Sequence, residues 1–240
     1  MPASTRLLLS ERFVSIQGEG ASVGEPAAFV RLARCNLACS WCDTPYSWDF
    51  ERYSFEEEVE TTTALEVAEW LVDNAPGRVI WTGGEPLVQQ KALVKAIGAL
   101  DERRRARGAR LDVLEVETNG TVPPLPALLE RIDQWNVSPK LQGSGEPEDR
   151  RIVAPVLATF AATGRAYFKF VLADEADERE ALDWIGRLDL PRERVLLMPA
   201  AATLDQLRER SPWVAAAALR ARLRFSGRLH LELFGGRRGT

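Results

Sequence analysis

Short apolar runs alternate along this chain with longer segments in which apolar residues recur at helical spacing. The apolar runs predict strands at 26–33, 78–84, 111–120, 134–139, 166–173 and 194–200. The helical spacing predicts helices at 62–75, 86–108, 125–132, 150–164, 178–190 and 203–224. The pattern therefore predicts a regular β/α alternation with six strands.

Such an alternation predicts right-handed crossovers and a parallel sheet that is apolar on both faces. Six units are too few for a complete eight-stranded barrel, so the sheet is either doubly wound or curled into a partial barrel. Both architectures place their chemistry at the carboxyl ends of the strands. Polar motifs follow the strands at these ends, namely CNLACSWCDT (35–44), TGGEP (82–86), ETNGT (117–121), SPK (138–140) and LMP (197–199).

Composition narrows the class of protein. With 240 residues, 45% hydrophobic and 28% charged, the chain suits one domain over residues 1–240. The formal net charge of −4 argues against a nucleic-acid or membrane surface and favours small molecules and other proteins as partners. No apolar run is long enough for a membrane span, and MPASTRLLLS is no secretion signal, so we expect a cytoplasmic protein.

All three cysteines of the chain, Cys35, Cys39 and Cys42, lie in one C-x3-C-x2-C stretch. Thiols clustered in a reducing compartment favour a metal site over disulfides. A structural zinc site usually has four protein ligands, yet the only histidine, His230, lies far along the chain. In a [4Fe–4S] cluster, three cysteines leave one iron open to an exogenous molecule.

This spacing, with Trp41 just before the last cysteine, resembles the signature loop of the radical S-adenosylmethionine superfamily. The resemblance implies that the open iron binds S-adenosylmethionine and that an electron from the cluster generates a 5′-deoxyadenosyl radical, which takes a hydrogen atom from the substrate. TGGEP, one strand later, resembles the motif whose backbone contacts the amino group of that cofactor. Taken alone, TGGEP is also an ordinary strand-to-helix turn.

The motifs outside the cysteine loop have two readings each. Arg31, four residues before the first cysteine, suits a substrate carboxylate or an internal ion pair with a glutamate. QGEG (17–20) is a binding loop or a flexible glycine turn, and ETNGT holds polar ligand groups or forms an Asn-Gly turn. In SPK the lysine suits a carboxylate, although surface lysines are usually solvated.

Taken together, these motifs resemble one family, the 7-carboxy-7-deazaguanine synthases, over most of the chain. The segments that carry the resemblance are SIQGEG (15–20), FVRLARCNLACSWCDT (29–44), TGGEP, ETNGT, SPK and RLHLELFGGRRGT (228–240). The resemblance implies a partial (β/α)6 TIM-like barrel and a homodimer. It implies a lyase of queuosine and 7-deazapurine biosynthesis that converts 6-carboxy-5,6,7,8-tetrahydropterin to 7-carboxy-7-deazaguanine with loss of ammonia.

The resemblance also implies the cofactors, namely a [4Fe–4S] cluster, S-adenosylmethionine and Mg²⁺, with flavodoxin or ferredoxin as reductant. It assigns the cluster to Cys35, Cys39 and Cys42, and Mg²⁺ to Thr44. The residues that it assigns to S-adenosylmethionine are Trp41, Cys42, Asp43, Gly84, Ser138, Pro139 and Lys140. Those that it assigns to the pterin are Ile16, Gln17, Gly18, Arg31, Thr82 and Thr240. No side chain is implied to be catalytic beyond the radical held by the cofactor.

One departure from the family and two other functions remain open at this point. The family often has a polar residue and an acid around the sixth strand, where this chain reads LLMPAA (196–201), so we expect backbone contacts there. A glycyl-radical activase is the alternative within the superfamily, although QGEG and CDT (42–44) argue against it. A zinc-stabilised module without catalysis is the alternative from another class.

Overall fold

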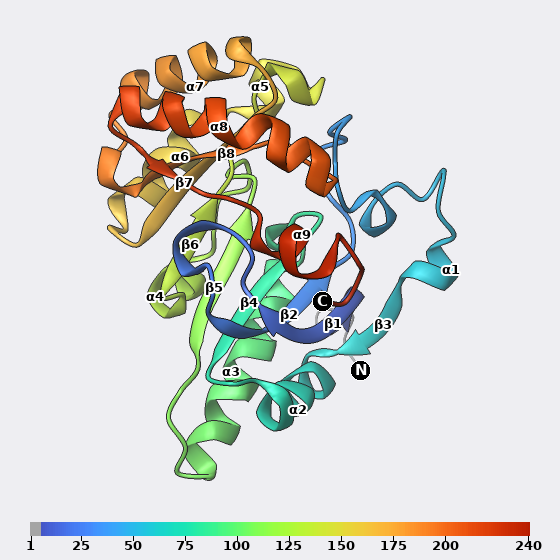
Figure 1. Cartoon of the computed structure of the whole chain (residues 1–240). Coiled ribbons are helices and arrows are strands. Elements are labelled where there is room, and N and C mark those ends of the chain that lie inside the picture. Colours follow the sequence, from blue (N-terminus) through green and yellow to red (C-terminus); the bar gives the residue numbers. More distant parts are fainter. Residues whose placement is uncertain (1–5) are drawn as a thin grey trace.

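The strands form one mixed sheet. The computed structural model describes residues 6–240, and within that range the sheet has nine strands in the order β3-β1-β2-β4-β5-β6-β7-β8-β9 (Figure 1). Their bounds are β1 Arg6–Ile16, β2 Pro26–Leu32, β3 Glu60–Thr63, β4 Arg78–Gly83, β5 Val113–Thr118, β6 Gln134–Val137, β7 Ala166–Leu172, β8 Val195–Pro199 and β9 Arg224–Phe225. The first five residues of the predicted domain lie outside the described range.

The six predicted strands are confirmed as β2 and β4 to β8, and each pairs with the next in parallel. The registers bring motifs from different strands together, because Arg31 lies opposite Thr82 and Glu117 lies opposite Asn136. The sheet is curled into the partial (β/α)6 TIM-like barrel expected for a radical S-adenosylmethionine enzyme.

The prediction of a purely parallel sheet was wrong at one edge. Strand β1 runs antiparallel to both β2 and β3. QGEG therefore follows the first strand of the chain and leads into the second. Strand β1 reads RLLLSERFVSI and is only half-buried, so it lacks the continuous apolar run that identified the other strands. At the other edge, the two residues of β9 extend β8 in parallel.

The predicted helices correspond to α2, α3, α4, α6, α7 and α8. The helices in the described chain are α1 Phe55–Glu58, α2 Ala64–Asn74, α3 Gln90–Ala106, α4 Pro126–Arg131, α5 Glu148–Arg151, α6 Ala154–Ala162, α7 Glu175–Arg187, α8 Leu204–Ala221 and α9 Leu229–Phe234. Thr63 and Glu66 form a capping box at the start of α2, and Asp174 caps α7. Segment 150–164 is split into α5 and α6, and α9 was not predicted.

The two faces of the curled sheet differ in chemistry because side chains alternate along each strand. Positions that face the helices, such as Val79 and Trp81 on β4, belong to the main apolar core. Positions of opposite parity include Arg31, Thr82 and Glu117, which line an interior cavity. The helices thus bury one face, while the other is left for a polar site. No helix in residues 6–240 is long and apolar enough to cross a membrane.

Candidate active site

A cavity of about 910 Å³ lies inside the curled sheet. It falls within the size range of small-molecule and cofactor sites, roughly 300–1,000 Å³. All of the residues predicted for metal, cofactor and substrate line it except Pro139, which directly follows the lining residue Ser138. Met198 and Ala200 of the LLMPAA segment also line it. Residues more than 200 positions apart in the chain therefore meet in one place.

The three cysteines lie on the loop that leaves β2, and all three are free thiols open to this cavity. Other parts of the chain brace the loop through its backbone. The Glu146 carboxylate accepts a hydrogen bond from the Ala38 amide, and the Ser40 amide donates to the Ser144 carbonyl at 2.9 Å. Trp48 Nε1 donates to the sulfur of Cys42 at 3.3 Å. The loop is thus held by segments that follow it in the chain.

TGGEP fixes the beginning of this loop. The amide of Gly84 donates to the Leu32 carbonyl at 3.1 Å, and the amide of Glu85 donates to the Arg34 carbonyl at 2.9 Å. A β-carbon at Gly84 would overlap the Arg34 carbonyl group, so only glycine allows this approach. The glycines of the motif therefore bring two backbones together beside Cys35.

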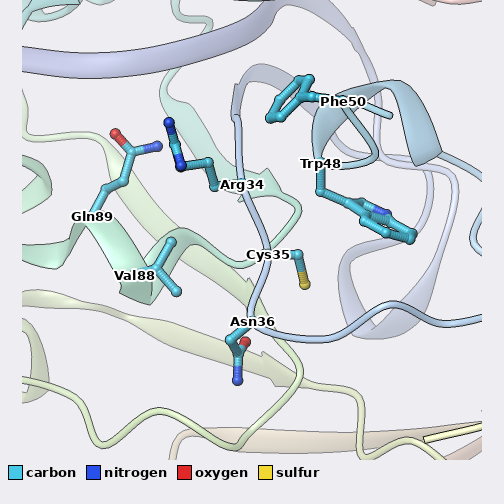
Figure 2. A pocket seen from close by; sticks show the side chains of 7 residues that line it. All are labelled: Arg34, Cys35, Asn36, Trp48, Phe50, Val88 and Gln89. Atoms are coloured by element: carbon cyan, nitrogen blue, oxygen red, sulfur yellow. The ribbon is translucent and has the colours of Figure 1, made fainter. Parts of the chain in front are cut away.

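Cys35 also borders a second, outer pocket of about 300 Å³. Figure 2 shows its lining side chains, which are Arg34, Cys35, Asn36, Trp48, Phe50, Val88 and Gln89. Arg34 turns the chain here in the left-handed region, with φ of 72°. The sulfur-bearing loop therefore forms the wall between the interior cavity and this outer pocket.

The three thiols of the loop are soft donors that suit the irons of an iron–sulfur cluster. Among residues 6–240, no group of three or more His, Cys, Asp or Glu side chains is arranged around a single metal ion. In a cubane, each cysteine binds a different iron, so the thiols need not converge on one point. Burial raises the pKa of Cys35 to about 12, so a metal that binds this thiol must displace its proton.

Near the cysteine loop the cavity has one charged and one apolar wall. Lys140 Nζ donates to Ser138 Oγ at 3.1 Å and lies 5.4 Å from the centre of the Trp41 ring. Met198 packs against Val171 and Trp41. Lys140 is thus oriented by its neighbours at the cavity wall, unlike a solvated surface lysine.

Glu117 of ETNGT, at the end of β5, orients residues from two other motifs. Its carboxylate accepts hydrogen bonds from Gln17 Nε2 at 3.0 Å and from Thr82 Oγ1 at 2.7 Å. In the same motif, Gly120 has φ of 79°, as expected for an Asn-Gly turn. ETNGT is therefore both a turn and a source of polar contacts in the cavity.

Of the two readings of Arg31, the internal ion pair is confirmed and the contact with a substrate carboxylate stays a prediction. Its Nε donates to the Glu11 carboxylate at 2.9 Å, so the internal ion pair exists. Arg31 also lines the cavity, and within the described chain its two Nη atoms donate no hydrogen bond to the protein. The guanidinium can therefore bind an anion while it stays paired.

Sequence reasoning missed a charged cluster that joins the ends of the chain. Glu19 pairs with Lys169 and with Arg228, whose Nε lies 2.7 Å from Glu19 Oε1, and Arg228 also pairs with Asp43. Burial alone would raise the pKa of Glu19, but Arg228 and Lys169 hold it well below its usual range. A lysine inside the apolar run AYFKFVLA (166–173) was the available signal for this cluster.

His230 was also missed as a lining residue. It comes from α9 and packs so closely on Gly18 that a β-carbon there would overlap its ring. Helix α9 thus packs directly on QGEG through His230.

Comparisons with known proteins agree with this geometry. Residues 30–151 match the model of the Radical SAM superfamily. A 7-carboxy-7-deazaguanine synthase of Pyrobaculum aerophilum is 39% identical over the full length of both chains. Another, of Hyperthermus butylicus, is 38% identical over 95% of this chain and 93% of its own. The crystal structure of QueE from Escherichia coli matches with a TM-score of 0.65 at 22% identity, covering 92% and 93% of the two chains, which indicates a shared fold.

Proposed function

The chain belongs to the 7-carboxy-7-deazaguanine synthase family of the radical S-adenosylmethionine superfamily, and from this premise we propose that it converts 6-carboxy-5,6,7,8-tetrahydropterin to 7-carboxy-7-deazaguanine with loss of ammonia. The observation that carries the proposal is the single cavity shared by the three-thiol loop and the unused Nη pair of Arg31. A radical source and a carboxylate-binding group therefore face the same space. Neither the activase nor the zinc module accounts for this pairing.

Cys35, Cys39 and Cys42 would hold the [4Fe–4S] cluster, with S-adenosylmethionine bound beside it. Together these cofactors supply the one-electron chemistry that removes a hydrogen atom from the substrate. The chain contributes binding and orientation. Lys140, held beside Trp41, would bind a carboxylate of S-adenosylmethionine, and Trp41 and Met198 would provide an apolar wall for its adenosine.

The substrate end would hold the pterin between three motifs. The Nη pair of Arg31 binds the carboxylate in a bidentate manner. Gln17 and Thr82, both oriented by Glu117, offer hydrogen bonds to the polar edge of the ring. This arrangement would hold the substrate by its carboxylate at one end and by the polar edge of its ring at the other.

Further parts of the proposal concern the metal and the partners. The Thr44 hydroxyl is a hard oxygen ligand that suits Mg²⁺, whose remaining ligands would be water and substrate oxygens. The protein would act as a homodimer and receive electrons from a flavodoxin or ferredoxin. It would work in the cytoplasm, where reducing conditions keep its cysteines as thiols. We also propose that residues 1–240 form one domain, since one main core joins the sheet to the helices that cover it.

The test is anaerobic incubation of reconstituted protein with S-adenosylmethionine, a reductant and the carboxy-tetrahydropterin. We expect ammonia and a deazapurine in equal amounts. Cleavage of S-adenosylmethionine without either product would support the radical chemistry of the superfamily and contradict the proposed substrate. Stoichiometric zinc without iron after reconstitution would reject the radical chemistry as well.

A further inference from the structure

We propose that Glu11 is a positioning residue that holds Arg31 ready for the substrate carboxylate and, through Arg238, fastens the C-terminal segment 235–240 over the same cavity. This inference rests on the proposed function, because it names how that site orients its carboxylate-binding arginine. Glu11 lies on β1, outside the motifs that identified the site.

The two oxygens of the Glu11 carboxylate serve different parts of the chain. Oε2 accepts hydrogen bonds from Arg31 Nε at 2.9 Å and from the Tyr46 hydroxyl at 3.1 Å. Oε1 accepts from Arg238 Nε at 2.8 Å. Only 12% of the Glu11 side chain is exposed. One nearly buried carboxylate therefore joins an arginine of β2 to an arginine of the C-terminal segment.

The bond from Nε determines how Arg31 meets a ligand. A guanidinium has a fixed fork of donors, so holding its Nε fixes the direction of the Nη pair. Within residues 6–240 these Nη atoms make no hydrogen bond to the protein, and Arg31 lines the cavity. The free edge of the guanidinium matches the two oxygens of a carboxylate.

Arg238 uses its donors differently. Besides the bond from Nε to Glu11, its Nη1 and Nη2 donate to the Glu58 carboxylate at 3.3 and 2.7 Å. Its guanidinium also stacks on the Tyr46 ring, 3.7 Å from the centre. All three nitrogens of Arg238 are therefore engaged with the protein. Arg238 acts as a latch, whereas Arg31 is left free for a ligand.

The latch holds a segment that borders the cavity. Gly236, Arg237, Arg238, Gly239 and Thr240 all line it. Figure 1 shows this segment, in red after α9, lying beside β1, to which Arg238 is bonded through Glu11. The same carboxylate thus orients the binding group and fixes a segment that borders the same cavity.

The negative charge of Glu11 is essential to both roles. Burial alone would raise the pKa of Glu11, but Arg238 and Arg31 lower it below its usual value, so it is ionised at neutral pH. Without that charge, two guanidiniums would face a neutral group and repel each other. We expect the half-exposed Arg238 to leave first and Arg31 to lose its fixed direction.

The experiment compares two probes that the enzyme cannot turn over, 6-carboxypterin and pterin, which differ only in the carboxyl group. Their dissociation constants are measured on reconstituted enzyme with S-adenosylmethionine and no reductant. We expect wild type to prefer 6-carboxypterin, and Glu11→Gln to reduce that preference by about tenfold or more. The matched control is Glu60→Gln, which removes the partner of the neighbouring Arg12 and is expected to change the preference less than twofold, as for an exposed pair.

A second measurement, hydrogen exchange of residues 229–240, reports on the latch. Glu11→Gln and Arg238→Gln should both accelerate exchange there, while only Glu11→Gln loses most of the carboxylate preference. Arg238→Gln still tests the latch if Glu11→Gln does not fold. A Glu11→Gln enzyme with wild-type preference, or slow exchange at 229–240 in both variants, overturns the inference. Absence of any preference in wild type overturns the carboxylate role of Arg31 and this inference together.

Discussion

The hydroxyl oxygen of Thr44 lies 3.8 Å from the sulfur of Cys42. The residue proposed for Mg²⁺ is therefore in direct contact with a residue proposed for the cluster. Thr44 immediately precedes the short turn Pro45–Ser47 and lines the cavity. The proposed roles of Thr44 and Cys42 can be tested separately, because a substitution at Thr44 removes the hydroxyl and leaves the Cys42 thiol in place.

We expect Thr44→Ala to lower the Mg²⁺ affinity by roughly tenfold or more, since an oxygen ligand is lost. The iron content and the visible spectrum should not change. Thr44→Ser keeps the hydroxyl and serves as the control. Mg²⁺ titration of the initial rate measures the effect, and an unchanged titration would mean that Thr44 is only a turn residue.

Metal analysis tests the cysteine loop directly. After anaerobic reconstitution we expect about four iron and four sulfide per chain, as in a cubane. Replacing any one of Cys35, Cys39 or Cys42 by alanine should remove most of both, because a cubane with two protein ligands is poorly held. The control is wild type treated with an iron chelator, which should lose the same visible absorption. Full iron content in a variant would show that its cysteine is not a ligand.

Gly84→Ala should prevent assembly of the cluster loop, because the added carbon overlaps the Arg34 carbonyl group. We expect reduced iron incorporation and a destabilised fold, measured by iron analysis and by denaturant unfolding. The matched control is Gly98→Ala in α3, where nothing lies within 4 Å of the added carbon. That change should stabilise the protein by about 0.5–1 kcal/mol, since alanine favours helices over glycine. Equal effects at the two sites would contradict the close packing beside Cys35.

Glu19→Gln should destabilise the fold at neutral pH by about 3–5 kcal/mol, because Lys169 and Arg228 would lose their shared buried counter-charge. The pKa of Glu19 is lower in the folded than in the unfolded protein, so its contribution is present above the unfolded value of 4.5. As the pH falls through the folded pKa, protonation removes that contribution.

The difference in unfolding free energy between wild type and Glu19→Gln should therefore shrink below pH 4.5. Denaturant unfolding between pH 3 and 7 measures it. The exposed pair of Arg12 and Glu60 provides the control, since Glu60→Gln should cost less than about 1 kcal/mol at every pH. A difference for Glu19→Gln that grows toward acid pH would contradict the assignment.

The sequence determined the parallel part of the fold because both faces of a central parallel strand are largely buried. Runs such as RVIWTGG (78–84) are therefore continuous and easy to recognise. The spacing of the three cysteines likewise predicted a single metal site, since three thiols within eight residues lie on one short loop. The glycines of TGGEP allow a close approach of two backbones, but the tertiary structure decided that Arg34 is the partner of Gly84.

Only the tertiary structure decided which charged residues share the cavity. Glu19 and Arg228 are 209 positions apart, and Glu11 and Arg238 are 227 apart, so no local pattern links them. Strand β1 escaped prediction because an antiparallel edge strand is half-exposed and carries the mixed sequence that places Glu11 beside Arg31. These ion pairs form because folding brings distant segments together. An ion pair requires only that two charges lie close in space, so it has no characteristic separation in the sequence.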